Sequence, residues 1–422
     1  MASLLLLAAA CGGSTAVDPI GPANPSGGDP SAEPGKGPDT SAPVLPIGPY
    51  TGLVGVTDVS ILYPLPTSGG AKSFIQPTEG GPHGALFPQA FSEIVMGPIG
   101  SLEKTTSEHP STYAELRLVS VRLDHCAVRG GPGCKSEVRV VFQALYEKAA
   151  GAEGDPSSGT AATDGGVHVT YDVPEAELVT MMKEILTLKK ANGDLATIDL
   201  RPHPILAEQG LGGAFAEGLR TILLHHLGAG RIARVTIFDH NFNPDSDGWQ
   251  FEMFDRAGDT LVAKNVPFVS SSGQLLAGSH ALTPLADSSA EDFSAASTPD
   301  PVRALVAANR PAKGTPESAA LYVAWQAALR VQNPTLHDTE TTDCVNCHLA
   351  EGARRIGDQV YAFKESTPGN EFRPARATAR ADQRTSVTNL HAFSYLHRAP
   401  SIMLRTMHES IVVADAMEAR VK

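Results

Sequence analysis

The chain has 422 residues, of which 42% are hydrophobic and 19% are charged, so it is long and apolar enough to fold around a core. It carries 33 basic against 46 acidic residues, a formal net charge of -13. This balance argues against a nucleic-acid binder, because neutralising phosphates requires clustered Lys and Arg. The 40 Gly and 32 Pro residues are many for a compact fold, which indicates linkers between folded parts.

Residues 1–11 form a short apolar segment that runs through leucines and alanines and ends at Cys11. The segment resembles a bacterial lipoprotein signal, although no basic residue precedes it and Ala8 stands where Leu is usual. The resemblance implies that the chain is cut before Cys11 and lipidated there. The protein would then be held at a membrane outside the cytoplasm, on the periplasmic or cell-surface side. A chance cysteine after an apolar N-terminus is the alternative.

The next segment, residues 12–52, is rich in Pro and Gly and poor in large apolar residues, so we expect a disordered tether. Residues 53–270 then alternate between apolar and polar side chains, which predicts an α+β domain rich in β-hairpins. One hairpin is expected from residues 116–123 and 138–142, and another from residues 232–238 and 249–254. Helices are expected from about Asp172 and over residues 214–227.

The first predicted hairpin has a cysteine at each end of its connection, Cys126 and Cys134. We expect a disulfide across its mouth, which would contribute about 2 to 3 kcal/mol by closing a short loop. The middle domain contains no GxSxG, HExxH or GxGxxG motif. Its sequence therefore predicts no catalytic constellation.

Residues 271–315 are rich in Ser, Ala, Pro and Gly and are predicted to form a linker with one short helix. Residues 316–422 form the last predicted part, which is mainly helical. It opens with an amphipathic helix that begins near Pro316 and ends near Asn333.

Cys344, Cys347 and His348 form a CxxCH motif within this last part. Two thiols at this spacing can each add to a vinyl group of haem, and the adjacent imidazole can then bind the iron. Here the chain resembles the c-type cytochromes. The resemblance implies one haem c per chain, attached through Cys344 and Cys347, with His348 as the proximal iron ligand. The polar stretch 335–343, where that family usually has a helix, is a departure from its pattern.

The sixth iron ligand has several candidates. A downstream methionine is usual in the family, and Met407 and Met403 precede a helix expected at residues 410–419, with Met407 slightly favoured. An open iron position is also compatible with the sequence. The competing histidines are His337, His391, His397 and His408.

The five cysteines are all accounted for if one is lipidated, two form a disulfide and two bind haem. Lipidation, disulfide formation and haem attachment are all typical of proteins outside the bacterial cytoplasm. Weaker alternatives for Cys344 and Cys347 are a zinc site completed by His348 and His337, or a redox-active dithiol.

Together these features predict a lipid-anchored extracytoplasmic protein that transfers single electrons to or from a redox partner protein, as a carrier more than an enzyme. Alternatives are a haem-based gas-binding or peroxidase-like protein, or a surface-binding lipoprotein with a structural CxxC site. The expected partners include a membrane, through the lipid anchor, and no nucleic acid.

Overall fold

The computed structural model describes most of the chain after residue 52, and all described residues belong to one compact unit, Pro38–Lys422. A large antiparallel sheet and several helices occur together in this unit, so the predicted α+β class is confirmed. The described residues are 53–67, 70–96, 112–125, 135–148, 159–194, 199–241, 248–277, 283–284, 301–306, 310–364, 368–374, 376, 379–380 and 389–422.

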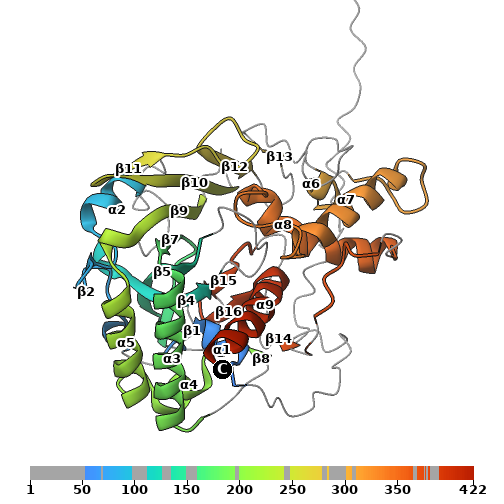
Figure 1. Cartoon of the computed structure of the whole chain (residues 1–422). Coiled ribbons are helices and arrows are strands. Elements are labelled where there is room, and N and C mark those ends of the chain that lie inside the picture. The colour runs from blue at the N-terminus through green and yellow to red at the C-terminus, as the bar shows by residue number, and fades with distance from the viewer. Residues whose placement is uncertain are drawn as a thin grey trace, which may run out of the picture. The chain divides into compact units, whose positions relative to one another are not determined.

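The central sheet has ten strands within the described residues, all paired antiparallel (Figure 1). Along its main path the order is β1, β4, β5, β7, β9, β10, β12, β13, while β6 adds to β5 and β11 to β10. The bounds are β1 Ser60–Leu62, β4 Leu116–Asp124, β5 Glu137–Lys148, β6 Gly159–Ala162, β7 Gly166–Asp172, β9 Ile232–Asn241, β10 Gly248–Ala257, β11 Thr260–Ala263, β12 Gly273–Ala277 and β13 Thr283–Pro284.

Both predicted hairpins are confirmed, because β4 pairs with β5 and β9 pairs with β10. Two neighbouring rows of paired residues show how the alternation gives the sheet two different faces. One row runs across Val121, Val140, Val169, Val235 and Phe254, and the next across Arg122, Arg139, Thr170, Arg234 and Asp255. We call the face of the first row the apolar face and that of the second row the polar face.

Helices α2 (Gln89–Met96), α3 (Glu175–Ala191) and α5 (Ala214–His226) share a buried cluster with the apolar face. The ring of Phe87 stacks on Phe142 of this face at 6.1 Å, and the Tyr171 hydroxyl donates to the Leu86 carbonyl at 2.8 Å. Helices α3 and α5 begin close to where the sequence predicts them, with Pro174 as the N-cap of α3. The apolar face is thus sealed by conventional hydrophobic packing.

The polar face is covered by the C-terminal part of the chain, which Figure 1 colours orange and red. Strands β15 (Phe393–Leu396) and β16 (Ala399–Ile402) form a hairpin over it, and helix α9 (Leu404–Val421) follows. Ser120 donates a hydrogen bond to the Phe393 carbonyl at 2.7 Å, and Gln143 donates to the Tyr395 carbonyl at 2.9 Å. Hydrogen bonds to polar side chains of the sheet therefore hold this cover in place.

Helices α6 (Pro301–Val306), α7 (Ser318–Val331) and α8 (Cys344–Ile356) pack together around a second buried cluster, which also contains Phe238 and Phe251 of the polar face. Strand β12 and helix α6 fall in the range 271–315, where the sequence predicts a linker. Strand β12 joins the sheet by pairing with β10, and Val302 and Leu305 of α6 are fully buried, so the segment is part of the compact unit.

Helix α9 begins at Leu404, earlier than the predicted residue 410. Met403 is its N-cap residue with extended backbone, and the Leu404 N–H donates to the Glu351 carboxylate of α8 at 2.7 Å. A carboxylate from another helix is a start signal that sequence spacing cannot reveal.

The remaining described elements are short. They are α1 Val56–Val59, α4 Pro204–Gln209, β2 Gly80–Gly81, β3 Gly84–Ala85, β8 Asp199–Leu200 and β14 Ala379–Arg380, with a π-helical turn at Gly357–Tyr361 after α8. None of the described helices combines the length and the apolar character that crossing a bilayer requires.

Candidate functional site

The CxxCH motif forms the first turn of α8. Asp343 is the N-cap residue, and its carboxylate accepts hydrogen bonds from the Asn346 backbone N–H at 3.0 Å and from the Asn346 side-chain amide at 2.7 Å. Asp is a favoured N-cap residue because its oxygen satisfies an N–H that has no partner within the helix. This cap starts the helix at Cys344 itself.

Gln274 of β12 ties this helix start to the sheet. Its side-chain amide donates to Asp343 at 2.9 Å, and its carbonyl oxygen accepts from the Val345 N–H at 3.2 Å. Asp343 and Gln274 are both buried, so each bond is made away from competing water. The motif is therefore fixed against the polar face of the sheet.

The three motif side chains share one face of α8, because residues three and four apart in a helix are neighbours. Cys344, Cys347 and His348 each keep part of their surface accessible, whereas Val345 and Leu349 are fully buried on the other side of the helix. Helices α6 and α7 pack against that buried side. The helix thus turns its two thiols and its imidazole away from its own hydrophobic contacts.

His348 is held in one tautomer. Its Nδ1 donates a hydrogen bond to the Leu390 carbonyl, which can only accept, and Nε2 has no hydrogen-bond partner within the described residues. Burial lowers the pKa of His348 to about 4, so the ring is neutral near pH 7. A neutral imidazole with Nδ1 bound to a backbone carbonyl and Nε2 free is the form in which histidine binds metals.

The thiols of Cys344 and Cys347 are free and not joined in a disulfide. Burial raises the pKa of Cys344 well above its usual range, and burial also raises the pKa of Cys347. Both sulfurs are therefore protonated near neutral pH, unlike the low-pKa thiolates of redox-active dithiols.

Aromatic side chains of the polar face lie beside the motif. The His348 ring centre is 5.0 Å from that of Phe251 and 6.2 Å from that of Phe238. Cys344 is packed against Met253, which comes from the same strand as Phe251. The wall opposite the motif is thus apolar, which would exclude water from anything held there.

Two further histidines lie against Phe238. The ring centres of His168 and His391 are each 5.2 Å from that of Phe238, with both rings nearly perpendicular to it. His391 is bound at both nitrogens, with Nδ1 2.7 Å from the Asn389 side-chain oxygen and Nε2 2.9 Å from the Asp164 carbonyl. His168 makes no hydrogen bond from its ring within the described residues. Burial, and then the charges of His348 and His391, lower the pKa of His168 to about 3.

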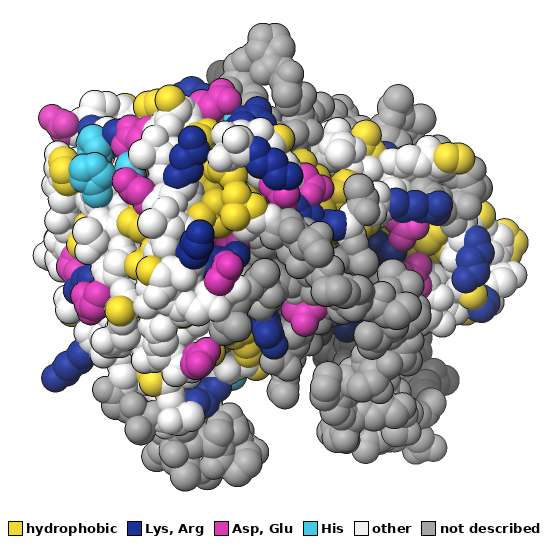
Figure 2. Space-filling model, turned by 60° about the horizontal axis from the view of Figure 1, so that its bottom comes forward, with side chains coloured by type: hydrophobic (Ala, Val, Ile, Leu, Met, Phe, Trp, Pro, Cys, Tyr) yellow, Lys and Arg dark blue, Asp and Glu magenta, His cyan; other side chains and the backbone are white. Residues whose placement is uncertain are grey.

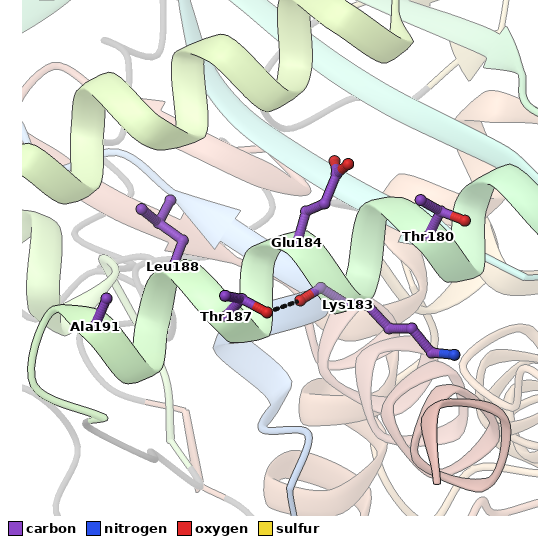
Figure 3. Close-up of a pocket in the computed structure, with 6 residues that line it drawn as sticks. All are labelled: Thr180, Lys183, Glu184, Thr187, Leu188 and Ala191. Atoms are coloured by element: carbon purple, nitrogen blue, oxygen red, sulfur yellow. Dashed lines mark hydrogen bonds between the residues drawn. The ribbon is translucent and has the colours of Figure 1, made fainter.

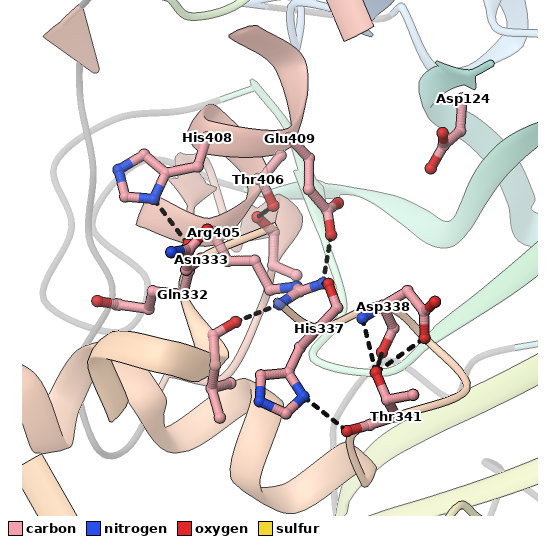
Figure 4. Close-up of polar contacts among 12 residues, drawn as sticks. Asp124, Gln332, Asn333, His337, Asp338, Thr341, Arg405, Thr406, His408 and Glu409 are labelled. Carbon is pink, nitrogen blue, oxygen red and sulfur yellow. Dashed lines mark hydrogen bonds and ion pairs between the residues drawn. The ribbon is translucent and has the colours of Figure 1, made fainter. Parts of the chain in front are cut away.

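An ionic network whose charges act on the pKa of Cys347 is centred on Glu409, which Figure 4 shows with Arg405. Glu409 of α9 pairs with Arg405 at 2.8 Å, with Arg139 at 3.5 Å and with Arg122. Burial alone would raise the pKa of Glu409, but these three arginines hold it well below its usual range. On the face shown in Figure 2, by contrast, acidic and basic side chains are interspersed over the surface.

Of the predicted sixth-ligand candidates, His391 lies beside Phe238, and the others have separate contacts in the fold. Met407 is packed in the large core cluster, and Met403 is buried at the start of α9. His337 donates from Nδ1 to the Thr341 carbonyl at 2.9 Å, and His408 donates from Nδ1 to the Gln332 carbonyl at 2.7 Å. His397 has a positive φ of 52° in the tight turn between β15 and β16.

Three predicted site residues, Cys11, Cys126 and Cys134, lie outside the described residues, so the lipidation and the disulfide stay predictions. Within the described part of the chain, no cluster of three or more His, Cys, Asp or Glu side chains is arranged to hold a metal ion. The alternative zinc site, with His337 beside the motif, is therefore not assembled there.

The sequence did not single out Gln274, Phe238 or His168. Gln274 lies in the predicted linker, and its importance depends on a contact 69 residues further along the chain. His168 stands among alternating apolar residues of β7, and a polar residue in such a pattern usually faces solvent. The signal that could have found it is that the polar positions of neighbouring strands fall on a single face.

A shallow groove on the surface of α3 has no link to the motif (Figure 3). All of its lining residues come from that single helix, where the Thr187 hydroxyl donates to the Lys183 carbonyl at 2.8 Å. One helix surface does not enclose a ligand, since binding sites are concave and bury most of what they hold. The groove is therefore no candidate for the site.

No family model, no curated protein and no solved structure matches this chain. Any function must therefore be argued from the residues described above.

Proposed function

We propose that the protein binds one haem c covalently through Cys344 and Cys347, with His348 as the proximal iron ligand, and that it transfers single electrons. The observation that carries the proposal is the state of His348. Its Nδ1 is bound to the Leu390 carbonyl and its Nε2 is free, on the helix face that also carries both thiols. Metal-binding histidines almost always donate their other ring N–H in this way.

The donor set and its surroundings fit haem in three respects. The free thiols are three residues apart on one helix face, as thioether formation requires. Phe238 and Phe251 supply an apolar wall for a macrocycle, next to the His348 ring. Asp343 and Gln274 hold the start of α8, so that the motif is positioned before any cofactor arrives. When bound, the haem supplies an iron centre that accepts and releases one electron at a time.

The thiol chemistry favours haem over the two weaker alternatives. Zinc ligands and redox-active dithiols need thiolates, whose formation is promoted by a lowered pKa. Burial instead raises the pKa of both Cys344 and Cys347. Thioether sulfurs carry no charge, so their burial beside Met253 and Phe251 is tolerated without a charged partner.

The location and partners belong to the same proposal. A lipid on Cys11 would anchor the protein to a membrane outside the cytoplasm, where cytochromes of this type are matured and where the proposed Cys126–Cys134 disulfide is stable. Electrons would pass to or from a redox partner protein in that compartment.

The experiment is a haem stain of the full chain, expressed with the cytochrome c maturation machinery and denatured by boiling in detergent. We expect a stained band for the wild type and none for the Cys344→Ala, Cys347→Ala double variant. Cys11→Ala is the matched control, because it removes a cysteine and the anchor but leaves the motif. It should stain fully and leave the membrane fraction. An unstained wild-type band from protein that contains stoichiometric zinc would contradict the proposal.

A further inference from the structure

We infer that His168, on the central strand β7, is the second axial ligand of the iron, so that the haem joins helix α8 to the polar face of the sheet. The inference rests on the proposed haem site, and it concerns a residue that the sequence pattern of c-type cytochromes does not indicate.

The strand pairing determines where His168 points. His168 pairs with Val141 of β5 and with Thr236 of β9, and Thr236 is two residues before Phe238. Side chains two residues apart on a strand lie on the same face, so His168 and Phe238 both project from the polar face. Strand β7 lies between β5 and β9 in the sheet, and α8 is held over the same face by Gln274.

The aromatic contacts bring His168 and His348 to the same place. The two ring centres lie 5.2 Å and 6.2 Å from that of Phe238, although the residues come from a strand and a helix that are 180 positions apart in the chain. Both side chains also keep part of their surface accessible. The sheet and the helix that lies over it therefore each present an imidazole beside the same aromatic ring.

The hydrogen bonds separate His168 from the other candidates. Within the described residues its ring nitrogens have no hydrogen-bond partner, whereas both nitrogens of His391 are engaged and the ring of His408 packs against Phe372 instead. An imidazole whose nitrogens make no hydrogen bond can bind iron without breaking an existing interaction.

The methionines favoured by sequence have other roles in the fold. Met407 belongs to the apolar core cluster that contains Ile411 and Met417 of the same helix, and Met403 forms the N-cap of α9, where its N–H donates to the Ala392 carbonyl. Neither methionine belongs to the buried cluster that contains Phe238 and Phe251. Histidine ligation also gives a lower reduction potential than methionine ligation, so the inference predicts a low-potential carrier.

The test uses electron paramagnetic resonance and optical spectra of the purified holoprotein. The wild type should be low spin in both oxidation states and should not bind CO. His168→Ala should become high spin and bind CO, and added imidazole should restore the low-spin spectrum. His168→Met should stay low spin with a raised reduction potential. The matched control is His391→Gln, which removes the other histidine beside Phe238 and should remain low spin.

The readouts distinguish the two proposals. Loss of covalent haem from the wild type would overturn the proposed function itself, whereas a stained but high-spin wild type would overturn only the assignment of His168. A stained His168→Ala protein that stays low spin without imidazole would overturn it as well. Labelling histidine with ¹⁵N in the wild type gives an independent check that needs no variant. Hyperfine coupling to two histidine nitrogens is expected, and coupling to one would contradict the inference.

Discussion

The two faces of the central sheet are covered through different kinds of interaction. On the apolar face, Val140 and its neighbours pack against helices, and hydrophobic burial stabilises the contact. On the polar face, adjacent positions of the same strands carry Arg122 and Arg139, which form ion pairs with Glu409 of α9, and His168, whose ring packs against Phe238.

The difference indicates which face is built for chemistry. A buried ion pair is often no more stabilising than apolar packing of the same volume, so stability alone does not explain the polar face. The polar face carries His168, with its lowered pKa, and it packs against His348 and Glu409, whose pKa values are also lowered, next to the CxxCH motif. Such clustering is a feature of functional sites. We therefore call the apolar face the scaffold and the polar face the cofactor wall of the proposed haem site.

The largest effect is expected from removing a core side chain of the scaffold. Phe142→Ala deletes a fully buried ring that stacks on Phe87, and it should lower the free energy of unfolding by about 3 to 5 kcal/mol. Denaturant unfolding measures this loss. The haem spectrum of the folded variant should be unchanged. Phe251→Ala, an equally buried ring on the polar face, should be destabilised as well but should alter the spectrum. Equal spectral changes in both variants would abolish the distinction between the faces.

The ionic network of the polar face gives the next effect. Glu409→Gln leaves the buried Arg405 and the partly buried Arg122 and Arg139 without their shared carboxylate, which should cost about 3 kcal/mol at pH 7. The exposed Glu208→Gln should be neutral. Because the folded pKa of Glu409 is depressed, its contribution is present above the unfolded pKa of about 4.5 and is lost as the pH falls toward the folded value. The gap between wild type and Glu409→Gln should therefore narrow in acid. A gap that is constant with pH would refute the network's role.

His203 is the exception on the scaffold side, and it should give a smaller, pH-dependent effect. Its ring stacks on Phe215 at 4.7 Å with neither nitrogen hydrogen-bonded, and burial lowers its pKa to about 3. Below pH 6.5 the imidazole of His203 is protonated in the unfolded chain but stays neutral in the folded protein. The free energy of unfolding therefore falls by about 1.4 kcal/mol per pH unit. His203→Phe should remove this loss and be more stable than wild type by about 2 kcal/mol at pH 5. Parallel pH profiles of the two proteins would rule this out.

The smallest effect is expected at the start of α8. Asp343→Ala removes the N-cap and leaves the Gln274 amide without its acceptor, which should cost about 1 kcal/mol. The yield of covalent haem should also fall, because the motif is less well positioned. The exposed Asp259→Ala should change neither quantity. An unaltered haem yield in Asp343→Ala would show that the cap does not position the motif.

The scaffold could largely be predicted from sequence, because its strands and helices follow local periodicity. The alternation of residues 116–123 and 138–142 predicted β4 and β5, and the spacing of apolar residues predicted α3 and α5. These patterns involve residues that are close together in the sequence, so they can be recognised without knowledge of the fold. The division of the chain into domains and linkers could not be predicted in the same way. Strand β12 lies in a Gly- and Ser-rich stretch, and it joins the sheet by pairing with β10.

The cofactor wall could be predicted only at the motif itself. Cys344, Cys347 and His348 are adjacent in sequence, so their chemistry can be recognised there. The groups that complete the wall come from distant strands and helices, such as His168 and Glu409. Their roles depend on strand register and on the path of the chain, which a single sequence does not reveal.

The most direct test of the central claim is peptide mass spectrometry of the protein matured in a cytochrome c-competent host. The account predicts that the peptide spanning Cys344 to His348 carries the full mass of one haem, retained after denaturation and acid extraction, in nearly every molecule. The same peptide from the wild type recovered without haem and with two free thiols, under conditions where a known c-type cytochrome is fully matured, would contradict the account.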